Sequence, residues 1–302
     1  MTLPRNKRIM SSTRREALSG YLFILPTYFL DALFVFLPLL SVIYLSLTRY
    51  DIFSLPRFIG LQNFHDLFQD PRLLTVYQNT FYFTFVAVFL NVGIGLLLAL
   101  ALNRTIPAGF NYLFRLAFFL PVIVSTVFLS VIWSALFATD TGIVNYYLGL
   151  VGIKPVAWFT DSTTAMTSII LLDVWKNAGF AMVIFLAGLQ NIPVQYYEAS
   201  QLDGAGPWQI FRKVTFPLLS PVIFFNTVIF SIGALQVFDS TKIITDGGPG
   251  DSTRSQAMYI YENAFQKFQM GYASTVAVGL LAVIIIITLI QFFLSRRWVH
   301  YE

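Results

Sequence analysis

Residues 275–294 read TVAVGLLAVIIIITLIQFFL, twenty consecutive residues without a charged side chain. A helix needs about 20 apolar residues to cross the hydrocarbon core of a bilayer, so this stretch is long enough to span a membrane. Five more stretches of comparable length and hydrophobicity precede it, at about residues 20–47, 78–102, 112–137, 167–189 and 221–243. The sequence therefore predicts an all-α membrane protein with six transmembrane helices.

The composition of the whole chain agrees with a membrane location. Of its 302 residues, 57% are hydrophobic and 11% are charged, against roughly 25% charged residues in soluble domains. The net charge of +4 is too small to indicate a nucleic-acid partner. The chain has no cysteine, which excludes disulfides, thiolate zinc sites and iron–sulfur clusters, and neither histidine has a neighbour at metal-ligand spacing, so we expect no metal site.

Lysine and arginine residues predict the orientation of the spans. We expect residues 1–19 to form a tail and residues 20–302 to form the transmembrane domain. The tail and the alternate connections on its side carry eleven Lys and Arg, whereas the other connections carry six. Positive residues accumulate on the cytoplasmic side of a membrane. The pattern predicts a multi-pass protein of the plasma membrane with both termini in the cytoplasm.

The longest connection predicted to be cytoplasmic, residues 190–220, contains YYEASQLDGAGPWQIFRKVTFP at positions 196–217. Two short helical patterns, at 197–202 and 208–215, flank a reversal that begins at Gly204. Glycine is expected there because it adopts a positive φ at little cost. Pro207 fits the first position of the second helix. The sequence predicts a pair of short helices between the fourth and fifth spans.

This segment resembles the Glu-Ala-Ala loop of permease subunits in bacterial ABC importers. That motif reads Glu-Ala-Ala, three residues, Gly, nine residues, then Ile-x-Leu-Pro. The residues of this chain at the same spacing are Glu198, Ala199, Ser200, Gly204, Val214, Phe216 and Pro217. Three of them, Ser200, Val214 and Phe216, differ mildly from the motif. The stretches 203–207, 245–249 and 118–121 are similar to the maltose-type family of carbohydrate permeases, and the resemblance extends over nearly the whole chain.

The resemblance implies a transport subunit that is not itself an enzyme. In that family the loop, here the coupling loop 190–220, docks into a cleft on a separate cytoplasmic ATPase. The implied coupling residues are Glu198, Ala199, Ser200, Asp203, Gly204, Val214 and Pro217. The implied partners are a second permease in a heterodimer, two ATPase subunits and an extracytoplasmic protein that delivers a carbohydrate. A P-loop needs Lys after Gly, and none of the six Lys follows Gly, so ATP and Mg would bind to the partner ATPase and this chain would hold no cofactor.

Polar residues inside the fourth and fifth spans are candidates for the substrate path, because ionisable groups in a membrane usually face the bundle interior or a water-filled cavity. By position in the maltose-type family, the path would use Trp175, Asn177, Phe180, Gly233 and Gln236. Asp173 joins this set as an ionisable residue in the same stretch of the fourth span. Sugar hydroxyls need hydrogen-bond partners, and sugar rings stack on aromatic side chains.

Two other interpretations stay open at this point. Asp173 and Lys176 are three residues apart and can share one helix face, so they could neutralise each other without touching substrate. They could also carry protons or ions in a secondary transporter, which is the alternative function. A membrane-embedded enzyme is a third possibility, although no Ser, His and Asp set converges in one segment.

Overall fold

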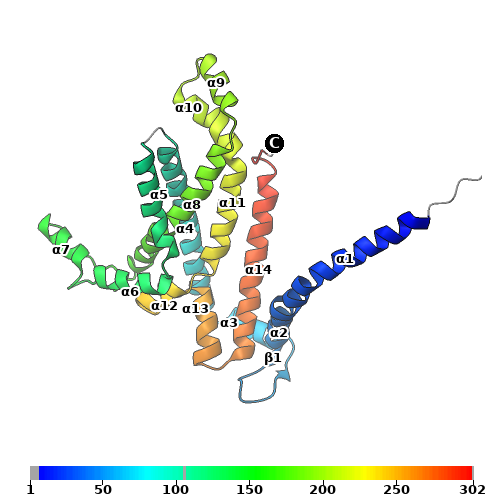
Figure 1. The fold of residues 1–302 in the computed structure, drawn as a ribbon. Coiled ribbons are helices and arrows are strands. Elements are labelled where there is room, and N and C mark those ends of the chain that lie inside the picture. The colour runs from blue at the N-terminus through cyan, green and yellow to red at the C-terminus, as the bar shows by residue number, and fades with distance from the viewer. Residues whose placement is uncertain (1–6, 105–106, 301–302) are drawn as a thin grey trace, which may run out of the picture.

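The computed structural model describes residues 7–104 and 107–300 (Figure 1). Five helical segments in this part are long and apolar enough to cross a membrane. They are the apolar part of α1 to α2 (Ser19–Ser46), α4 (Pro71–Leu102), α8 (Ala165–Gln190), α10 to α11 (Pro207–Leu235) and α14 (Met270–Ser295). A bent pair, α5 (Ala108–Ile123) and α6 (Thr126–Leu136), makes six if it counts as one crossing. The fold is the all-α membrane bundle that the sequence predicts.

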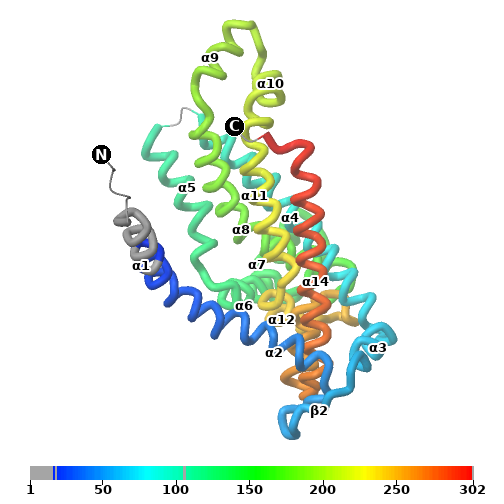
Figure 2. Tube along the Cα trace, turned by 90° about the vertical axis from the view of Figure 1, so that its right-hand side faces the viewer, coloured from blue at the N-terminus to red at the C-terminus, as the bar shows by residue number. Residues whose placement is uncertain are grey.

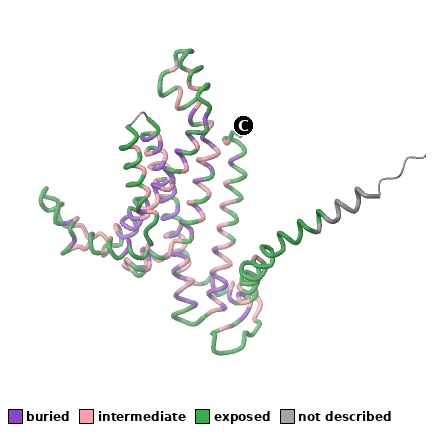
Figure 3. Tube along the Cα trace, viewed as in Figure 1, coloured by how far each residue is buried: buried purple, intermediate pink, exposed green. Residues whose placement is uncertain are grey.

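The core of the bundle lies between α4, α8 and α11. A cluster of buried side chains joins these three helices, including Ala99 from α4, Met182 and Phe185 from α8, and Leu219 from α11. A second cluster nearer the other end contains Phe83 and Ile169. Apolar burial therefore fixes the central helices, which Figure 3 shows with the most buried residues.

The first span is much less buried than the others. It consists of α1 (Lys7–Asp31), the π-helical turn η1 (Ala32–Phe36) and α2 (Leu37–Ser46). Of the residues in its 18-residue apolar stretch, only 6% are buried within the chain. In Figure 1, α1 points away from the bundle, while α2 contacts α14. Large apolar side chains exposed in this way are stable only against lipid or another subunit.

The third span differs from the straight helix expected over residues 112–137. Val124 and Ser125 are extended, and α5 and α6 meet at 101°. Pro121 lacks the N–H of a helical residue, and the β-branched run that follows it has a lower helix propensity. With 16 residues, α5 is about 24 Å long, which is shorter than the roughly 30 Å hydrocarbon core. The chain therefore turns before α5 completes the crossing.

The boundaries of three other spans also differ from those expected, and the sixth begins at Met270 rather than 275. The second begins at Pro71 rather than 78, because the Asp70 carboxylate caps α4 by accepting a hydrogen bond from the Arg72 N–H. The fifth ends at Leu235 rather than 243, since the chain breaks there before α12 (Asp239–Thr245). The remaining elements are β1 (Thr48–Arg49), β2 (Arg57–Phe58), α3 (Gln62–Gln69), α7 (Ile143–Leu150), α9 (Val194–Leu202), α13 (Gln256–Tyr261) and η3 (Glu262–Gln266). The two strands pair antiparallel.

Candidate functional site

The coupling loop forms a helical projection at one end of the bundle. Figures 1 and 2 show α9 and α10 (Pro207–Ile210) beyond the ends of the other helices. The turn after α9 has the Schellman pattern, in which the Ala205 N–H donates to the Ser200 carbonyl and the Gly204 N–H donates to the Gln201 carbonyl. Gly204 has a φ of +74°, a conformation that side chains disfavour. The expected reversal at Gly204 is confirmed.

The second helix of the loop is continuous with the fifth span. Pro207 occupies the first turn of α10, and the Gln209 side chain accepts a hydrogen bond from the Gly206 N–H. A π-helical turn, η2 (Phe211–Thr215), then leads into α11 (Phe216–Leu235) without a break. The structure thus has one short helix and one long helix where the sequence suggested two short ones. The loop and the fifth span therefore share one helix from Pro207 to Leu235.

The predicted coupling residues divide into an exposed and a half-buried group. Glu198, Ala199, Asp203 and Gly204 are exposed on the projection, whereas Val214 and Pro217 are half-buried where it meets the bundle, and Ser200 donates to the Tyr196 carbonyl. Two large apolar side chains that the motif does not contain are more prominent. Leu202 is 89% exposed and Trp208 is 70% exposed. The sequence could have indicated both residues, because large apolar side chains beside an exposed turn mark contact surfaces.

Segments that the charge pattern places on one side of the membrane meet at the end that carries the projection. The His300 N–H donates to the Ser220 hydroxyl, which brings the C-terminal segment to the start of the fifth span. A cavity of about 710 Å³ separates the end of α4 from the coupling loop, with Arg104, Tyr197 and Trp208 among its lining residues. The relative placement of these three segments agrees with the predicted topology.

The charged residues of the fourth span have separate partners. Asp173 accepts hydrogen bonds from the side-chain amides of Asn91 and Asn177, both at 2.9 Å. Lys176 donates to the Val122 carbonyl at 3.4 Å. That carbonyl lies in the last turn of α5, where helical acceptors lose their partners. No ion pair joins Asp173 to Lys176 in the described part of the chain, so Lys176 binds the end of the broken third span instead.

The other proposed path residues lie at a similar depth in the bundle. The rings of Phe180 on α8 and Phe230 on α11 are 6.2 Å apart, and the two helices run antiparallel. Asn177 precedes Phe180 by three residues and Gly233 follows Phe230 by three. At a rise of 1.5 Å per residue, Gly233 and Asn177 therefore lie at about the same depth. Trp175 is 49% exposed, and its ring lies 5.3 Å from that of Trp133 on α6. The contact with Trp133 depends on the bend after α5, which the sequence did not reveal.

The arrangement contains no candidate metal centre among residues 7–104 and 107–300. It consists of membrane-crossing helices and a projecting loop that extends one of them. These features are those of a helical membrane protein with a projecting loop that is open to contact with a partner.

Comparison with known proteins assigns the family. Residues 91–300 match the family described as binding-protein-dependent transport system inner membrane component. The chain is 40% identical over 296 residues to the probable ABC transporter permease protein YesP of Bacillus subtilis (strain 168), covering 96% of this chain and 94% of YesP. It is 35% identical to the lactose transport system permease protein LacF of Rhizobium radiobacter, covering 95% and 99%. The chain belongs to this family of inner-membrane transport components, and the resemblance to ABC importer permeases is confirmed.

A solved structure with the same fold covers almost the whole chain. It is the crystal structure of a bacterial ABC transporter involved in the import of the acidic polysaccharide alginate. The TM-score is 0.83 at 26% identity, with 96% of this chain and 99% of that chain aligned. Membership in the family makes this chain a transport subunit of the membrane, not an enzyme.

Proposed function

We propose that this chain is one of two permease subunits in an ATP-driven, binding-protein-dependent carbohydrate importer. The carbohydrate class rests on relatives such as the lactose permease LacF and on the alginate transporter. The complex would contain a second permease, two cytoplasmic ATPase subunits that bind ATP and Mg, and an extracytoplasmic binding protein. Both termini of this chain would face the cytoplasm.

The observation that carries the proposal is the continuity between the projection and the fifth span. Leu202 and Trp208 present apolar surface to the ATPase, and Glu198 presents a carboxylate that would pair with a basic ATPase residue. Closure of the ATPase would move α9, and the long helix from Pro207 to Leu235 would carry that movement to the opposite end. The loop residues act on the path through this helix and do not touch substrate.

The substrate path would lie along α8 and α11 at the depth of the Phe180 and Phe230 contact. Trp175 has a half-exposed ring for stacking against a sugar, and Asn177 has an amide for its hydroxyls. Asp173 would align Asn177 by holding its amide. Gly233 and Gln236 would line the end of α11, where both are exposed.

Ion-coupled secondary transport has less support than ATP-driven import. Asp173 is held by two amides, and Lys176 binds a backbone carbonyl. Both groups therefore have structural partners that a proton or ion carrier would have to release. The family to which the chain belongs also consists of binding-protein-dependent transport components.

Affinity purification through a tag on this chain tests the proposal. The wild-type chain is expected to retain an ATPase, and Glu198→Lys is expected to lose it because a like charge would face the basic ATPase residue. Asp140→Lys is the matched control, since it makes the same charge change at an exposed position outside the coupling loop. If the wild-type chain purifies without an ATPase, or if both variants retain it equally, the coupling assignment is wrong.

A further inference from the structure

The cavity beside the coupling loop takes no part in the proposed transport cycle. This inner cavity has a volume of about 710 Å³, within the range of ligand sites. Its walls come from residues 97–104 at the end of α4, from α9, and from the stretch of α10 and η2 at residues 207–215. The cavity therefore lies between the second span and the helices of the coupling loop.

Two faces of α9 carry different residues. Tyr197 and Gln201 are four residues apart, so they share one face, and both line the inner cavity. Glu198 and Leu202 are also four residues apart and share the adjacent face, where both are exposed and neither lines the cavity. The α9 face proposed to meet the ATPase is thus distinct from the face that lines the cavity.

The polar groups of the inner cavity favour an anionic ligand. Arg104 is the only charged residue among the described residues that line it. Arg104 is exposed and forms no ion pair within the described part of the chain. Asn103 and Gln201 contribute side-chain amides, and the Tyr197 hydroxyl accepts from Thr215 at 3.4 Å, which leaves its own proton available. One cation and several further donors, with no carboxylate, favour a group such as a phosphate, which has negative charge and several acceptor oxygens.

The apolar walls of the inner cavity lie deeper in the membrane than Arg104. Leu97 and Leu100 line the cavity from within the apolar run of α4, and Leu97 is 66% exposed, as a lipid-facing residue is. Arg104 is seven residues beyond Leu97, which is about 10 Å at the rise of a helix. On the other wall the rings of Phe211 and Trp208 stack 5.5 Å apart, and tryptophan is typical of the headgroup level. This order of apolar and cationic groups matches a phospholipid, whose chains lie in the hydrocarbon and whose phosphate lies at the surface.

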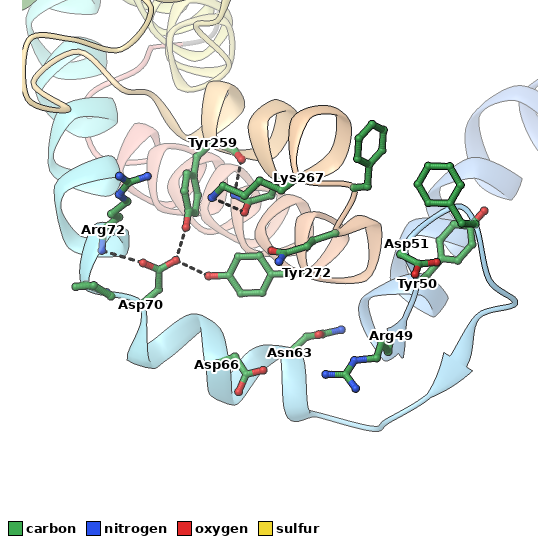
Figure 4. Close-up of a pocket in the computed structure, with 15 residues that line it drawn as sticks. Arg49, Tyr50, Asp51, Asn63, Asp66, Asp70, Arg72, Tyr259, Lys267 and Tyr272 are labelled. Atoms are coloured by element: carbon green, nitrogen blue, oxygen red, sulfur yellow. Dashed lines mark hydrogen bonds between the residues drawn. The ribbon is translucent and has the colours of Figure 1, made fainter.

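A larger cavity at the opposite end of the molecule lacks this selectivity (Figure 4). Its volume is about 840 Å³, and its lining carries carboxylates as well as cations, among them Asp51, Asp66, Arg49 and Lys267. Lys267 already donates to the Asn263 side chain at 3.1 Å. Charges of both signs commit that cavity to no class of ligand, whereas the inner cavity carries a single sign.

Asp70 has a structural role in the larger cavity. Its carboxylate accepts hydrogen bonds from the hydroxyls of Tyr259 and Tyr272, the latter at 2.6 Å, and from the Arg72 N–H at 2.9 Å. Burial alone would raise the pKa of Asp70, but these hydrogen bonds and the nearby Lys267 charge hold its pKa below the ordinary value. The ionised carboxylate therefore ties the starts of α4 and α14 to α13.

We propose that the inner cavity binds an anionic phospholipid from the leaflet on the coupling-loop side, with its phosphate at Arg104 and an acyl chain along Leu97 and Leu100. Basic pockets between membrane helices on the cytoplasmic side bind lipid headgroups in this way. The bound lipid fills the space between α4 and the coupling loop, so that the second span supports the loop. The lipid site stands on the cavity itself, whereas its effect on coupling rests on the proposed function.

Native mass spectrometry of the whole purified complex, with phosphatidylglycerol as the probe, tests the charge contact. The wild type is expected to retain this lipid, and Arg104→Gln is expected to bind it about tenfold more weakly, because a hydrogen bond to a charged group is lost. Arg104→Lys keeps the charge and should recover most of the loss. Arg297→Gln, the same change at an exposed arginine outside the cavity, should match the wild type. Equal retention by Arg104→Gln and the wild type would overturn the proposal.

Competition separates a lipid from a soluble phosphate. Glycerol phosphate and inorganic phosphate are expected not to displace phosphatidylglycerol, because neither covers the apolar walls of the cavity. Phosphatidylcholine, which has no net charge, should be retained less than phosphatidylglycerol. Displacement of the lipid by either soluble phosphate would contradict the assignment of a phospholipid.

A phosphatidylglycerol that carries a photoreactive diazirine in its acyl chain locates the site. Illumination of the whole complex is expected to label residues 97–104 in the wild type and to label them less in Arg104→Gln. Labelling around Leu289, which is 63% exposed on α14, serves as the internal control and should be equal in both. Unchanged labelling of residues 97–104 in Arg104→Gln would show that the lipid is not held at Arg104.

Stimulation of ATP hydrolysis by the binding protein measures the effect on coupling. In vesicles of phosphatidylcholine, added phosphatidylglycerol is expected to increase the stimulation of the wild-type complex and not that of Arg104→Gln. If the binding protein stimulates the wild type in neither kind of vesicle, the proposed function is wrong, while lipid retention still decides the site. If it stimulates the wild type equally in both, the proposed function stands and the lipid has no part in coupling.

Discussion

Replacing Gly179 by alanine tests the packing that holds the bent third span against the fourth. A Cβ on Gly179 would lie 2.6 Å from the carbonyl carbon of Phe118 and closer still to its oxygen. Both atoms belong to the α5 backbone, so no side-chain rotation can relieve the clash. Carbon atoms in contact are separated by about 3.5 to 4.0 Å, and α5 would therefore have to move by about 1 Å.

That displacement has an estimable cost and a measurable consequence. Overpacking of this kind destabilises a core by about 1 to 3 kcal/mol, and it would also separate Lys176 from the Val122 carbonyl. Gly93→Ala is the matched control, because a Cβ there meets nothing within 4 Å and alanine is the better helix former. The apparent Tm of the purified complex should fall for Gly179→Ala and not for Gly93→Ala. Equal Tm values for the two variants would refute the close approach of α5 and α8.

Three further outcomes are expected. Lys176→Met should destabilise the complex by about 1 to 3 kcal/mol in thermal unfolding, since the Val122 carbonyl loses its donor. Lys176→Arg should retain most of the stability. An equal loss in both variants would exclude the carbonyl contact as the cause. Gly204→Val should cost about 1 to 2 kcal/mol from its positive φ alone, because no atom lies within 4 Å of a Cβ there. The variant should reduce ATPase stimulation while the binding protein still attaches. Normal stimulation would contradict the coupling role. The depressed pKa of Asp70 means that its stabilising contribution is present above the ordinary value of 3.8 and is lost only as the pH falls through the lower folded value. The Tm difference between the wild type and Tyr272→Phe should therefore be the same at about pH 7 and about pH 5, and a difference that vanishes by about pH 5 would show that Asp70 is not held in the ionised form.

The membrane class, the helical content and the reversal at Gly204 could be predicted from local sequence. The length of an apolar stretch is enough to indicate a span, and residues 275–294 have the length and the apolar character of one. Gly204 and Pro207 have strong conformational preferences of their own, so their positions were also predictable. These features depend on residues that are close together in the chain.

The features that the sequence did not reveal depend on contacts between distant residues. The break at Val124 lies in an apolar run that would also form a straight helix, and it is stabilised by Lys176, 54 positions from Val122 along the chain. The separation of Asp173 from Lys176 follows from Asn91, which is on another helix. The Asp70 carboxylate meets the hydroxyls of Tyr259 and Tyr272 only where α13 and α14 pack beside the start of α4. Spacing within one segment carries no information about such pairs.

Uptake into proteoliposomes tests the central claim most directly. The assay would contain this chain, its second permease, its ATPase and its binding protein, with ATP enclosed with the ATPase and a panel of labelled carbohydrates outside. We predict that one of these carbohydrates accumulates only when ATP and binding protein are both present, and that Glu198→Lys abolishes the accumulation. Accumulation driven by a proton or sodium gradient without ATP, and unaffected by Glu198→Lys, would contradict the account.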